Sequence, residues 1–425
     1  MKVLVVSYVA LMNTTPNGRT MRNLLQGIPA EDLISFNVLG TPDVGSCASA
    51  YKISNSDAKK SALTFTERGG VLTNIEQTAN TNFAADGTHG GNKHAKKYLM
   101  RELVWKLSSL HRKRFKKWLK DQAPECIIFM YSDAPFMLNL TTWISKLLNI
   151  PMIVYSCENY CFKEYNYLGG GDKSLAYKMH HKKLLKATKK LFERADALIC
   201  NSDELGEEFK RDYRVLNYRT VTMSSTMEYF KNVEVRPISE SKVVYCGALG
   251  MNRINAIIDI AESLASIDPT LKLDVYGRVT IPEVQERITS CKAIRYNGLV
   301  PYSEVKNITQ NAALNIELIN NDPITARNKK YGLSTKFADA LACGTPFLIY
   351  APAEMVETQI TKRFECAFIA TDKNQLKDQL YKALTDAEAR EVQVANARKA
   401  TDALFNEKTN LKNVAELLEI VSNKK

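Results

Sequence analysis

The sequence has 425 residues and lacks several features that would assign it to a functional class at once. Its nine cysteines are scattered without a Cys-x-x-Cys pair, so their spacing predicts neither a zinc site nor a disulfide framework. We interpret them as the reduced thiols of a cytoplasmic protein. No apolar run approaches the length of a membrane-spanning helix. No Asp-x-Asp triplet occurs, and we expect no metal site.

Acidic residues are scarce in the first half of the chain. Residues 1–215 hold 31 Lys and Arg against 21 Asp and Glu, which gives +10 of the chain's total net charge of +12. Two blocks concentrate this charge: residues 93–120 carry 11 basic side chains and one acid, and residues 173–194 carry eight and one. Such blocks are either solvated helix faces or surfaces for an anionic partner. Nucleic acid is not the expected partner, because no recognition motif accompanies the charge.

Short apolar runs of strand length alternate with helical patterns along most of the chain. This alternation predicts an α/β protein with parallel, doubly wound sheets. The expected strands are residues 2–9, 34–39, 126–131, 152–155, 198–200, 242–246, 271–276, 294–296, 314–318 and 347–350. Residues 41–95 are rich in Ser, Thr, Asn and Gly and are interpreted as a long insertion.

The alternation restarts after a polar segment at residues 222–241. We therefore expect two Rossmann-like domains, residues 1–225 and 236–405, that face each other across a cleft. A helix in the C-terminal segment 406–425 has one apolar face and could pack back on the first domain. Ligands in such folds bind at the carboxyl ends of the strands.

The most informative stretch is residues 332–346, with the sequence GLSTKFADALACGTP. Ser334 is a good N-cap, and Gly344 is a good terminator followed by a proline. A lysine in the first turn, Lys336, would add to the positive end of the helix and form an anion site suited to a diphosphate. Asp339, one turn on, could accept hydrogen bonds from a ribose diol. The alternative is an ordinary capped helix with a Lys336–Asp339 surface pair.

This stretch resembles the donor-site helix of GT-B glycosyltransferases, the group-1 or family-4-like enzymes, which reads roughly Pro-x-Lys-Leu-x-Glu-x-Leu-Ala-x-Gly-x-Pro. Further segments resemble other parts of that fold in the same order: residues 16–19, 195–202, 243–253, 273–277 and 294–300. The resemblance covers most of the chain and implies the GT-B fold. It makes residues 1–225 the acceptor-side domain and residues 236–405 the domain that binds the nucleotide sugar.

The resemblance also implies roles for individual residues. The donor would be held by Gly18, Gly247, Arg253, Tyr331, Ser334, Thr335, Lys336 and Asp339. Among these, Arg253 and Lys336 would neutralise the diphosphate, and Asp339 would bind the ribose. Glu158 would touch the acceptor hydroxyl. Three positions depart from the family pattern: Tyr331 stands where the first of two glutamates is usual, Ala248 replaces an arginine and Cys157 replaces a histidine.

The function implied is sugar transfer from a nucleoside diphosphate sugar to a saccharide or lipid-linked acceptor, in polysaccharide or glycolipid biosynthesis. The resemblance implies a retaining, metal-independent reaction without a cofactor. An inverting reaction would need a base in the first domain, for which Glu158 and Asp133 are the candidates. The five histidines lie outside these motifs. The alternatives are a catalytically degenerate GT-B subunit and a nucleotide-sugar epimerase.

A helix over residues 96–120 would place Leu99, Leu103, Leu107 and Leu110 along one stripe. We expect this stripe to be buried. The basic side chains of 93–120 and 173–194 would then contact an anionic acceptor or the inner face of the cell membrane. Residues 327–330 are expected to form a loop, either one that closes over the nucleotide or a solvated connection.

Overall fold

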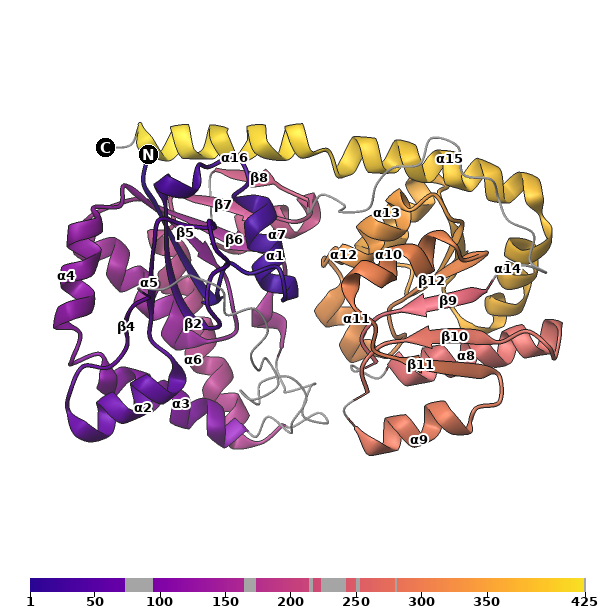
Figure 1. Cartoon of the computed structure of the whole chain (residues 1–425), viewed down its shortest axis with the longest axis horizontal. Coiled ribbons are helices and arrows are strands. Elements are labelled where there is room, and N and C mark those ends of the chain that lie inside the picture. The colour runs from indigo at the N-terminus through magenta and orange to yellow at the C-terminus, as the bar shows by residue number, and fades with distance from the viewer. Residues whose placement is uncertain are drawn as a thin grey trace. The chain divides into compact units, whose positions relative to one another are not determined.

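The computed structural model describes residues 1–72, 95–163, 173–213, 217–222, 242–249, 253–279 and 281–423. The chain divides into two compact units (Figure 1). The first comprises Met1–Val221 and Glu407–Lys425, and the second comprises Thr222–Asn406. The polar segment that separates the two sequence patterns falls almost wholly outside the described residues.

The first unit is built on an eight-stranded sheet in the order β4-β3-β2-β1-β5-β6-β7-β8. Its strands are β1 (Val3–Val9), β2 (Leu33–Leu39), β3 (Ser49–Lys52), β4 (Gly70–Val71), β5 (Cys126–Met130), β6 (Met152–Ser156), β7 (Ala197–Cys200) and β8 (Tyr218–Thr220). All neighbours pair in parallel except β3 and β4. Strands β1, β5, β6 and β7 are almost entirely buried, as expected for parallel strands covered on both faces.

The interpretation of residues 41–95 as an insertion is wrong for its first part. Strand β3 and helix α2 (Asn55–Thr64) continue the βα alternation there. The strand is only four residues long, and the helix begins with a capping box in which Ser54 and Asp57 bond each other's backbone N–H groups. A short strand followed by a polar, capped helix has a composition close to that of a loop. Residues 73–94 lie outside the described part.

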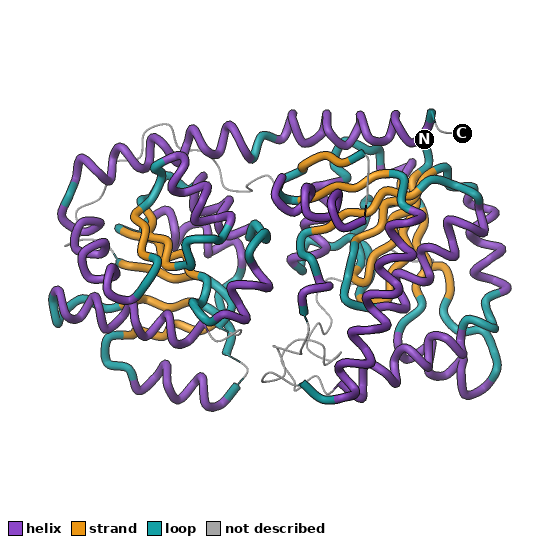
Figure 2. The backbone as a smooth tube through the Cα atoms, turned by 180° about the vertical axis from the view of Figure 1, so that it is seen from behind, coloured by secondary structure: helices purple, strands orange, loops and turns teal. Residues whose placement is uncertain are grey.

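Helices cover both faces of this sheet (Figure 2). They are α1 (Pro16–Leu24), α2, α3 (Ala95–Ser108), α4 (Lys113–Gln122), α5 (Pro135–Leu148), α6 (Leu175–Arg194), α7 (Asp203–Tyr213) and α16 (Glu407–Ser422). The single helix expected over 96–120 is two helices, α3 and α4, separated at residues 109–112.

The expected burial of the leucine stripe is also wrong. Leu103, Leu107 and Leu110 are 50%, 42% and 73% exposed. Helix α3 instead buries the neighbouring side that carries Trp105, because that ring stacks on Phe136 of α5 at a centroid distance of 4.2 Å. The larger aromatic surface takes the core position, and the leucines stay at the surface.

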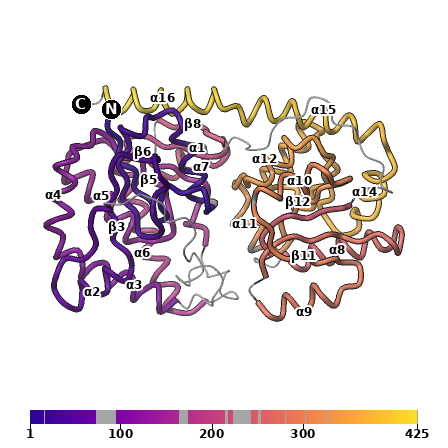
Figure 3. The backbone as a smooth tube through the Cα atoms, viewed as in Figure 1, coloured from indigo at the N-terminus to yellow at the C-terminus, as the bar shows by residue number. Residues whose placement is uncertain are grey.

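The C-terminal helix α16 packs on the first unit, next to the N-terminal segments (Figure 3). Its buried Val414, Leu417 and Val421 join the same hydrophobic core as Met21 and Leu24 of α1. Polar contacts fix its register: Arg219 Nε lies 3.1 Å from a Glu416 carboxylate oxygen, and Asn413 donates to the carbonyl of Thr220 at 2.8 Å.

The second unit is a six-stranded, all-parallel sheet in the order β11-β10-β9-β12-β13-β14. Its strands are β9 (Val243–Cys246), β10 (Leu273–Tyr276), β11 (Ile294–Gly298), β12 (Leu314–Leu318), β13 (Phe347–Tyr350) and β14 (Phe368–Ala370). In chain order this is 3-2-1-4-5-6, the arrangement of dinucleotide-binding folds. The prediction of two Rossmann-like sheets is therefore confirmed, although strands β3, β4, β8 and β14 were not among those expected.

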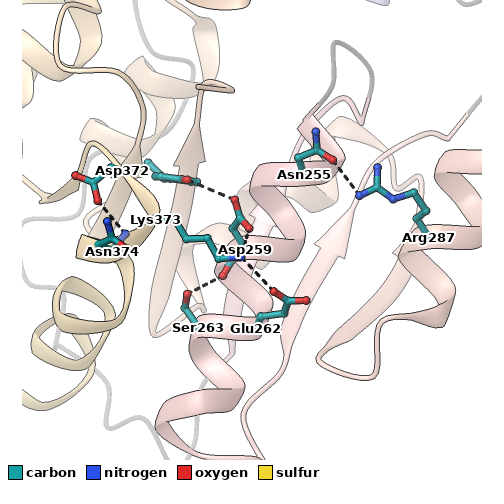
Figure 4. A network of polar contacts seen from close by, with 9 residues as sticks. Asn255, Asp259, Glu262, Ser263, Arg287, Asp372, Lys373 and Asn374 are labelled. Atoms are coloured by element: carbon teal, nitrogen blue, oxygen red, sulfur yellow. Dashed lines mark hydrogen bonds and ion pairs between the residues drawn. The ribbon is translucent and has the colours of Figure 1, made fainter. Parts of the chain in front are cut away.

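The helices of the second unit are α8 (Arg253–Ile267), α9 (Pro282–Ser290), α10 (Tyr302–Gln310), α11 (Pro323–Lys329), α12 (Thr335–Ala342), α13 (Val356–Phe364), α14 (Lys373–Thr385) and α15 (Ala387–Leu404). Polar contacts tie α8 to its neighbours (Figure 4). Lys373 at the start of α14 pairs with Asp259 at 2.6 Å, and Arg287 of α9 donates to Asn255 at 2.9 Å. These contacts fix α14 and α9 against α8 beside the six-stranded sheet.

The described residues contain neither a membrane-spanning helix nor a cluster of metal ligands. No helix there is long and apolar enough to cross a membrane. No group of three or more His, Cys, Asp and Glu side chains in the same residues could hold a metal ion.

Candidate functional site

A small pocket of about 30 Å³ lies where the strand order of the second unit reverses. Strand β9 is followed along the chain by β10 on one side, whereas β12 lies on its other side. The pocket is lined by residues of both strands, including Cys246 and Glu317, and by Lys336 and Asp339 of α12. Such a switch point leaves a crevice at the carboxyl ends of the two central strands, where open α/β sheets bind their ligands.

Helix α12 points its first turn toward this crevice. The Ser334 hydroxyl accepts a hydrogen bond from the backbone N–H of Phe337 at 3.1 Å, which confirms the predicted N-cap. Phe337 and Leu341 are fully buried and fix the helix on the core. Gly344 has a φ of 76° just after the last turn, which confirms it as the terminator.

Lys336 is the central cation of this site. Its ammonium lies 3.3 Å from a carboxylate oxygen of Glu317 and 4.9 Å from the ring centroid of Tyr245. A Cβ on Gly247 would come within 3.0 Å of the same ammonium, so the glycine leaves the space that Lys336 occupies. The alternative of a Lys336–Asp339 surface pair is wrong, because Lys336 pairs with Glu317 and Asp339 is buried.

The pKa of Lys336 is raised in this surrounding. Burial lowers it, but the negative charge of Glu317 and the Tyr245 hydroxyl outweigh the loss of hydration. The positive charge of Arg253, at the start of α8, acts in the opposite direction and also lowers the pKa of Lys336. The charges of Lys336 and Arg253 therefore act on each other across this site.

Glu357, in the first turn of α13, is a second carboxylate at this site. It is buried and accepts a hydrogen bond from the backbone N–H of Ser334 at 2.6 Å, just ahead of α12. Burial and the neighbouring charge of Glu317 raise its pKa to about 7, against the lowering effects of Ser334 and Lys336. A carboxyl group that is half neutral near pH 7 weakens the repulsion of an incoming anion.

Sequence reasoning missed both Glu317 and Glu357. The signal for Glu317 was available: a lone carboxylate at the end of an apolar strand, 19 residues before Lys336. No local signal marked Glu357, which follows Ser334 by 23 residues and reaches it only through the fold.

Other predicted donor residues lie around the same helix start. Thr335 is the first residue of α12, and Arg253 donates to the carbonyl of Ala248 at 3.4 Å in the turn after β9. Tyr331 precedes α12, with the Lys330 ammonium 5.2 Å from its ring centroid. The loop expected at 327–330 is wrong for its first part, since residues 327–329 form the last turn of helix α11.

The remaining two predicted residues belong to the first unit. Gly18 lies in the first turn of α1, where its N–H donates to Thr15 at 3.1 Å. A Cβ at Gly18 would overlap the carbonyl oxygens of Met12 and Ala10, so the local packing itself requires glycine. The structure thus gives Gly18 a structural reason for being glycine, independent of any ligand.

Glu158 follows the carboxyl end of β6. Its carboxylate pairs with the buried ammonium of Lys163 at 3.0 Å. Burial raises the pKa of Tyr160 well above its ordinary value, and the charges of Glu158 and Asp133 raise it further. Both candidate bases therefore lie near Tyr160, at the carboxyl ends of β5 and β6.

His180 is the buried histidine among the described residues, and its surroundings do not suit a base. His180 of α6 is 3% exposed and stacks on Tyr98 at a centroid distance of 4.8 Å. Burial and the charge of Arg101 lower its pKa to about 4. A buried, stacked imidazole of this kind is part of the packing.

Comparison with known proteins places the fold. Residues 257–419 match the glycosyl transferase-like family. No curated protein matches the chain in sequence. The chain is similar in structure to sucrose-phosphate synthase from Thermosynechococcus elongatus, with a TM-score of 0.66 at 14% identity over 100% of both chains.

It is also similar to Anabaena HepE in complex with UDP, with a TM-score of 0.63 at 11% identity over 99% of this chain and 100% of that one. A glycosyltransferase from Rickettsia africae gives 0.58 at 12% identity, over 99% and 98% of the two chains. These neighbours are GT-B glycosyltransferases, so the predicted GT-B fold is confirmed.

Proposed function

Because the chain has the GT-B fold and carries a glycosyl transferase-like segment, we propose that it transfers a sugar from a nucleoside diphosphate sugar to an acceptor hydroxyl. The observation that carries this proposal is the position of Lys336. It lies at a helix N-terminus, beside a glycine turn and at the switch point of a 3-2-1-4-5-6 sheet. HepE, a structural neighbour, has been solved with UDP and with UDP-glucose, which supports this class of donor.

In the proposed complex, the diphosphate binds the free N–H groups at the start of α12. Lys336 and Arg253 neutralise its charge, which grows on the leaving oxygen as the glycosidic bond breaks. The Glu317 carboxylate holds the ammonium of Lys336 in place before the donor arrives. Asp339, buried one turn along the helix, binds the ribose.

We further propose a retaining reaction. The acceptor oxygen forms a bond to the anomeric carbon as the bond to the diphosphate breaks, and the departing phosphate oxygen takes the acceptor proton. The ion pair with Lys163 fixes the Glu158 carboxylate, which suits a residue that orients the acceptor hydroxyl. The acceptor is a saccharide or lipid-linked saccharide, and the basic helices of the first unit place the protein at an anionic membrane surface.

The test is release of free nucleoside diphosphate from a panel of sugar nucleotides, with and without saccharide acceptors. We expect Lys336→Ala and Asp339→Asn to lower the rate by ~100-fold or more, since removing one preorganised electrostatic contact costs about that much. The matched control is Lys377→Ala, which removes an exposed lysine of α14 in the same unit. Unchanged transfer in the Lys336 and Asp339 variants would reject the residue assignment.

A further inference from the structure

A large pocket of about 530 Å³ lies in the first unit, on helices α3, α4, α5 and α6. Its volume is in the range of small-molecule sites. None of the residues assigned above to the donor or acceptor lines it. The pocket is lined by six cationic side chains: Lys106, Arg112, Lys116, Lys183, Lys186 and Lys190.

These six cations have no ion-pair partner among the residues that the structure describes. Two nearby lysines outside the pocket do have one: Lys117 of α4 pairs with Asp121 at 2.7 Å, and Lys189 of α6 pairs with Glu193 at 4.0 Å. Six like charges around one cavity repel one another, and a bound anion would relieve that repulsion.

Arg112 is fixed inside the pocket wall. Its side chain is 7% exposed, and it donates to the carbonyl of Trp105 at 3.3 Å and to the hydroxyl of Ser108 at 3.4 Å. Burial lowers its pKa to about 10, so it remains a guanidinium at neutral pH. Its hydrogen bonds go to neutral groups, while the charge of Glu67, beyond ion-pair distance, favours its charged form.

Aromatic rings form the apolar part of the wall. Trp105 stacks on Phe136 and is held by a hydrogen bond from its Nε1 to Asn55 at 2.9 Å. Trp143 lies on another side, with the Lys116 ammonium 5.7 Å from its ring centroid. The lining therefore offers flat apolar surfaces beside cations, a combination that suits a sugar or other ring that bears charged groups.

One acid, Glu102, is among the described residues that line the pocket, and its side chain is 8% exposed. Burial raises the pKa of Glu102 to about 7, although the charge of Arg101 lowers it. At pH 7 this single carboxyl group is about half neutral, and it cannot balance six cations.

We propose that this pocket is a binding site for a phosphate-bearing ligand, separate from the donor site of the second unit. The phosphate groups contact the lysines and Arg112, and the remainder of the ligand packs on Trp105 and Trp143. The phosphate can come from a soluble phosphorylated saccharide or from the headgroup of a lipid. Leu103 and Leu107 of α3, and Leu110 just after it, are exposed and close to Lys106 in sequence. A lipid chain would lie along these leucines. The proposal does not depend on the proposed transferase activity.

The pocket provides its own optical probe. The chain has three tryptophans, and two of them, Trp105 and Trp143, line the pocket. We would titrate the full-length protein with inorganic tripolyphosphate and follow the tryptophan fluorescence. The titration is run in a Lys336→Ala background, so that phosphate bound at the donor site does not contribute. A parallel arm measures sedimentation with phosphatidylcholine vesicles that either contain or lack phosphatidic acid.

The decisive comparison is between two double variants of α6. Lys183→Gln with Lys186→Gln removes two pocket charges, and Lys182→Gln with Lys189→Gln removes two charges outside the pocket from the same helix. We expect roughly a tenfold or greater loss of affinity in the first and less than a twofold change in the second.

Each outcome decides the proposal. Loss confined to the pocket variant supports it, with tripolyphosphate binding indicating a soluble ligand and binding to phosphatidic acid vesicles alone indicating a lipid headgroup. Equal weakening in both variants would mean a diffuse charge effect and overturn it. Absence of binding to both probes would overturn it as well.

Discussion

At the scale of single residues, the candidate site at the start of α12 places one lysine among two acids. Glu317 pairs with Lys336, and Glu357 holds the N–H of Ser334 just ahead of the same helix. Lys336, Ser334 and Asp339 could be predicted from sequence, because the cap, the first-turn cation and the buried face of one helix are local patterns. The two acids could not, because they reach the helix through the order of the strands.

Glu357 predicts a pH-dependent stability. Its pKa is raised from an ordinary 4.5 to about 7, mainly by burial, so the folded chain holds this proton more tightly than the unfolded chain does. Stability contributed by the neutral form is fully present below pH 4.5 and is lost as the pH rises to about 7. Glu357→Gln keeps an acceptor for the Ser334 N–H and removes the buried charge. We expect it to add ~1–3 kcal/mol at pH 8 and little at pH 4.5.

The measurement is denaturant unfolding of wild type and Glu357→Gln at both pH values. Glu354→Gln, at an exposed position two residues from the start of α13, is the matched control and should change neither value. A gain in stability that is the same at both pH values would show that the variant acts through packing and that Glu357 is not the titrating group.

At the scale of elements, the sequence predicted the buried strands well because parallel strands are continuous apolar runs. It failed where competing surfaces decide the outcome. On α3, a leucine stripe at helical spacing predicted the buried face, yet Trp105 and its stack on Phe136 took the core position. Periodicity identifies candidate faces, but the partner element selects one of them, and that partner was 31 residues away in sequence.

The N-cap of α12 gives a prediction at this scale. Ser334→Ala removes the hydroxyl that accepts from Phe337, and Asp372→Ala removes the equivalent cap of α14, which accepts from Asn374 at 2.8 Å. Each loss should cost about 1 kcal/mol of unfolding free energy. If the start of α12 binds the donor diphosphate, Ser334→Ala alone should also weaken nucleoside diphosphate binding, by about tenfold in a calorimetric titration. Equal affinities in the two variants would argue against the phosphate site.

At the scale of the whole molecule, the chain has two sheets, each with its own switch point. In the first unit the order reverses between β1 and β5, near Gly18 and Asp133, and in the second between β9 and β12, near Lys336. Six of the 31 Lys and Arg of residues 1–215 line the pocket on α3, α4, α5 and α6, whereas the proposed donor site of the second unit uses two cations. Under the two proposals, the charge asymmetry in the sequence corresponds to two different ways of holding an anion.

The last helix tests how the chain is divided into units. Leu417 of α16 is fully buried in the core of the first unit, although the whole second unit precedes it in sequence. Leu417→Ala should lower the stability of the first unit by ~2–5 kcal/mol through the cavity it leaves.

All three tryptophans lie in the first unit, so their fluorescence follows its unfolding. Leu380→Ala, an equally buried change in α14, should shift the circular-dichroism transition and leave the fluorescence transition in place. A fluorescence transition that moves with Leu380→Ala and stays with Leu417→Ala would show that α16 is not part of the first cooperative unit.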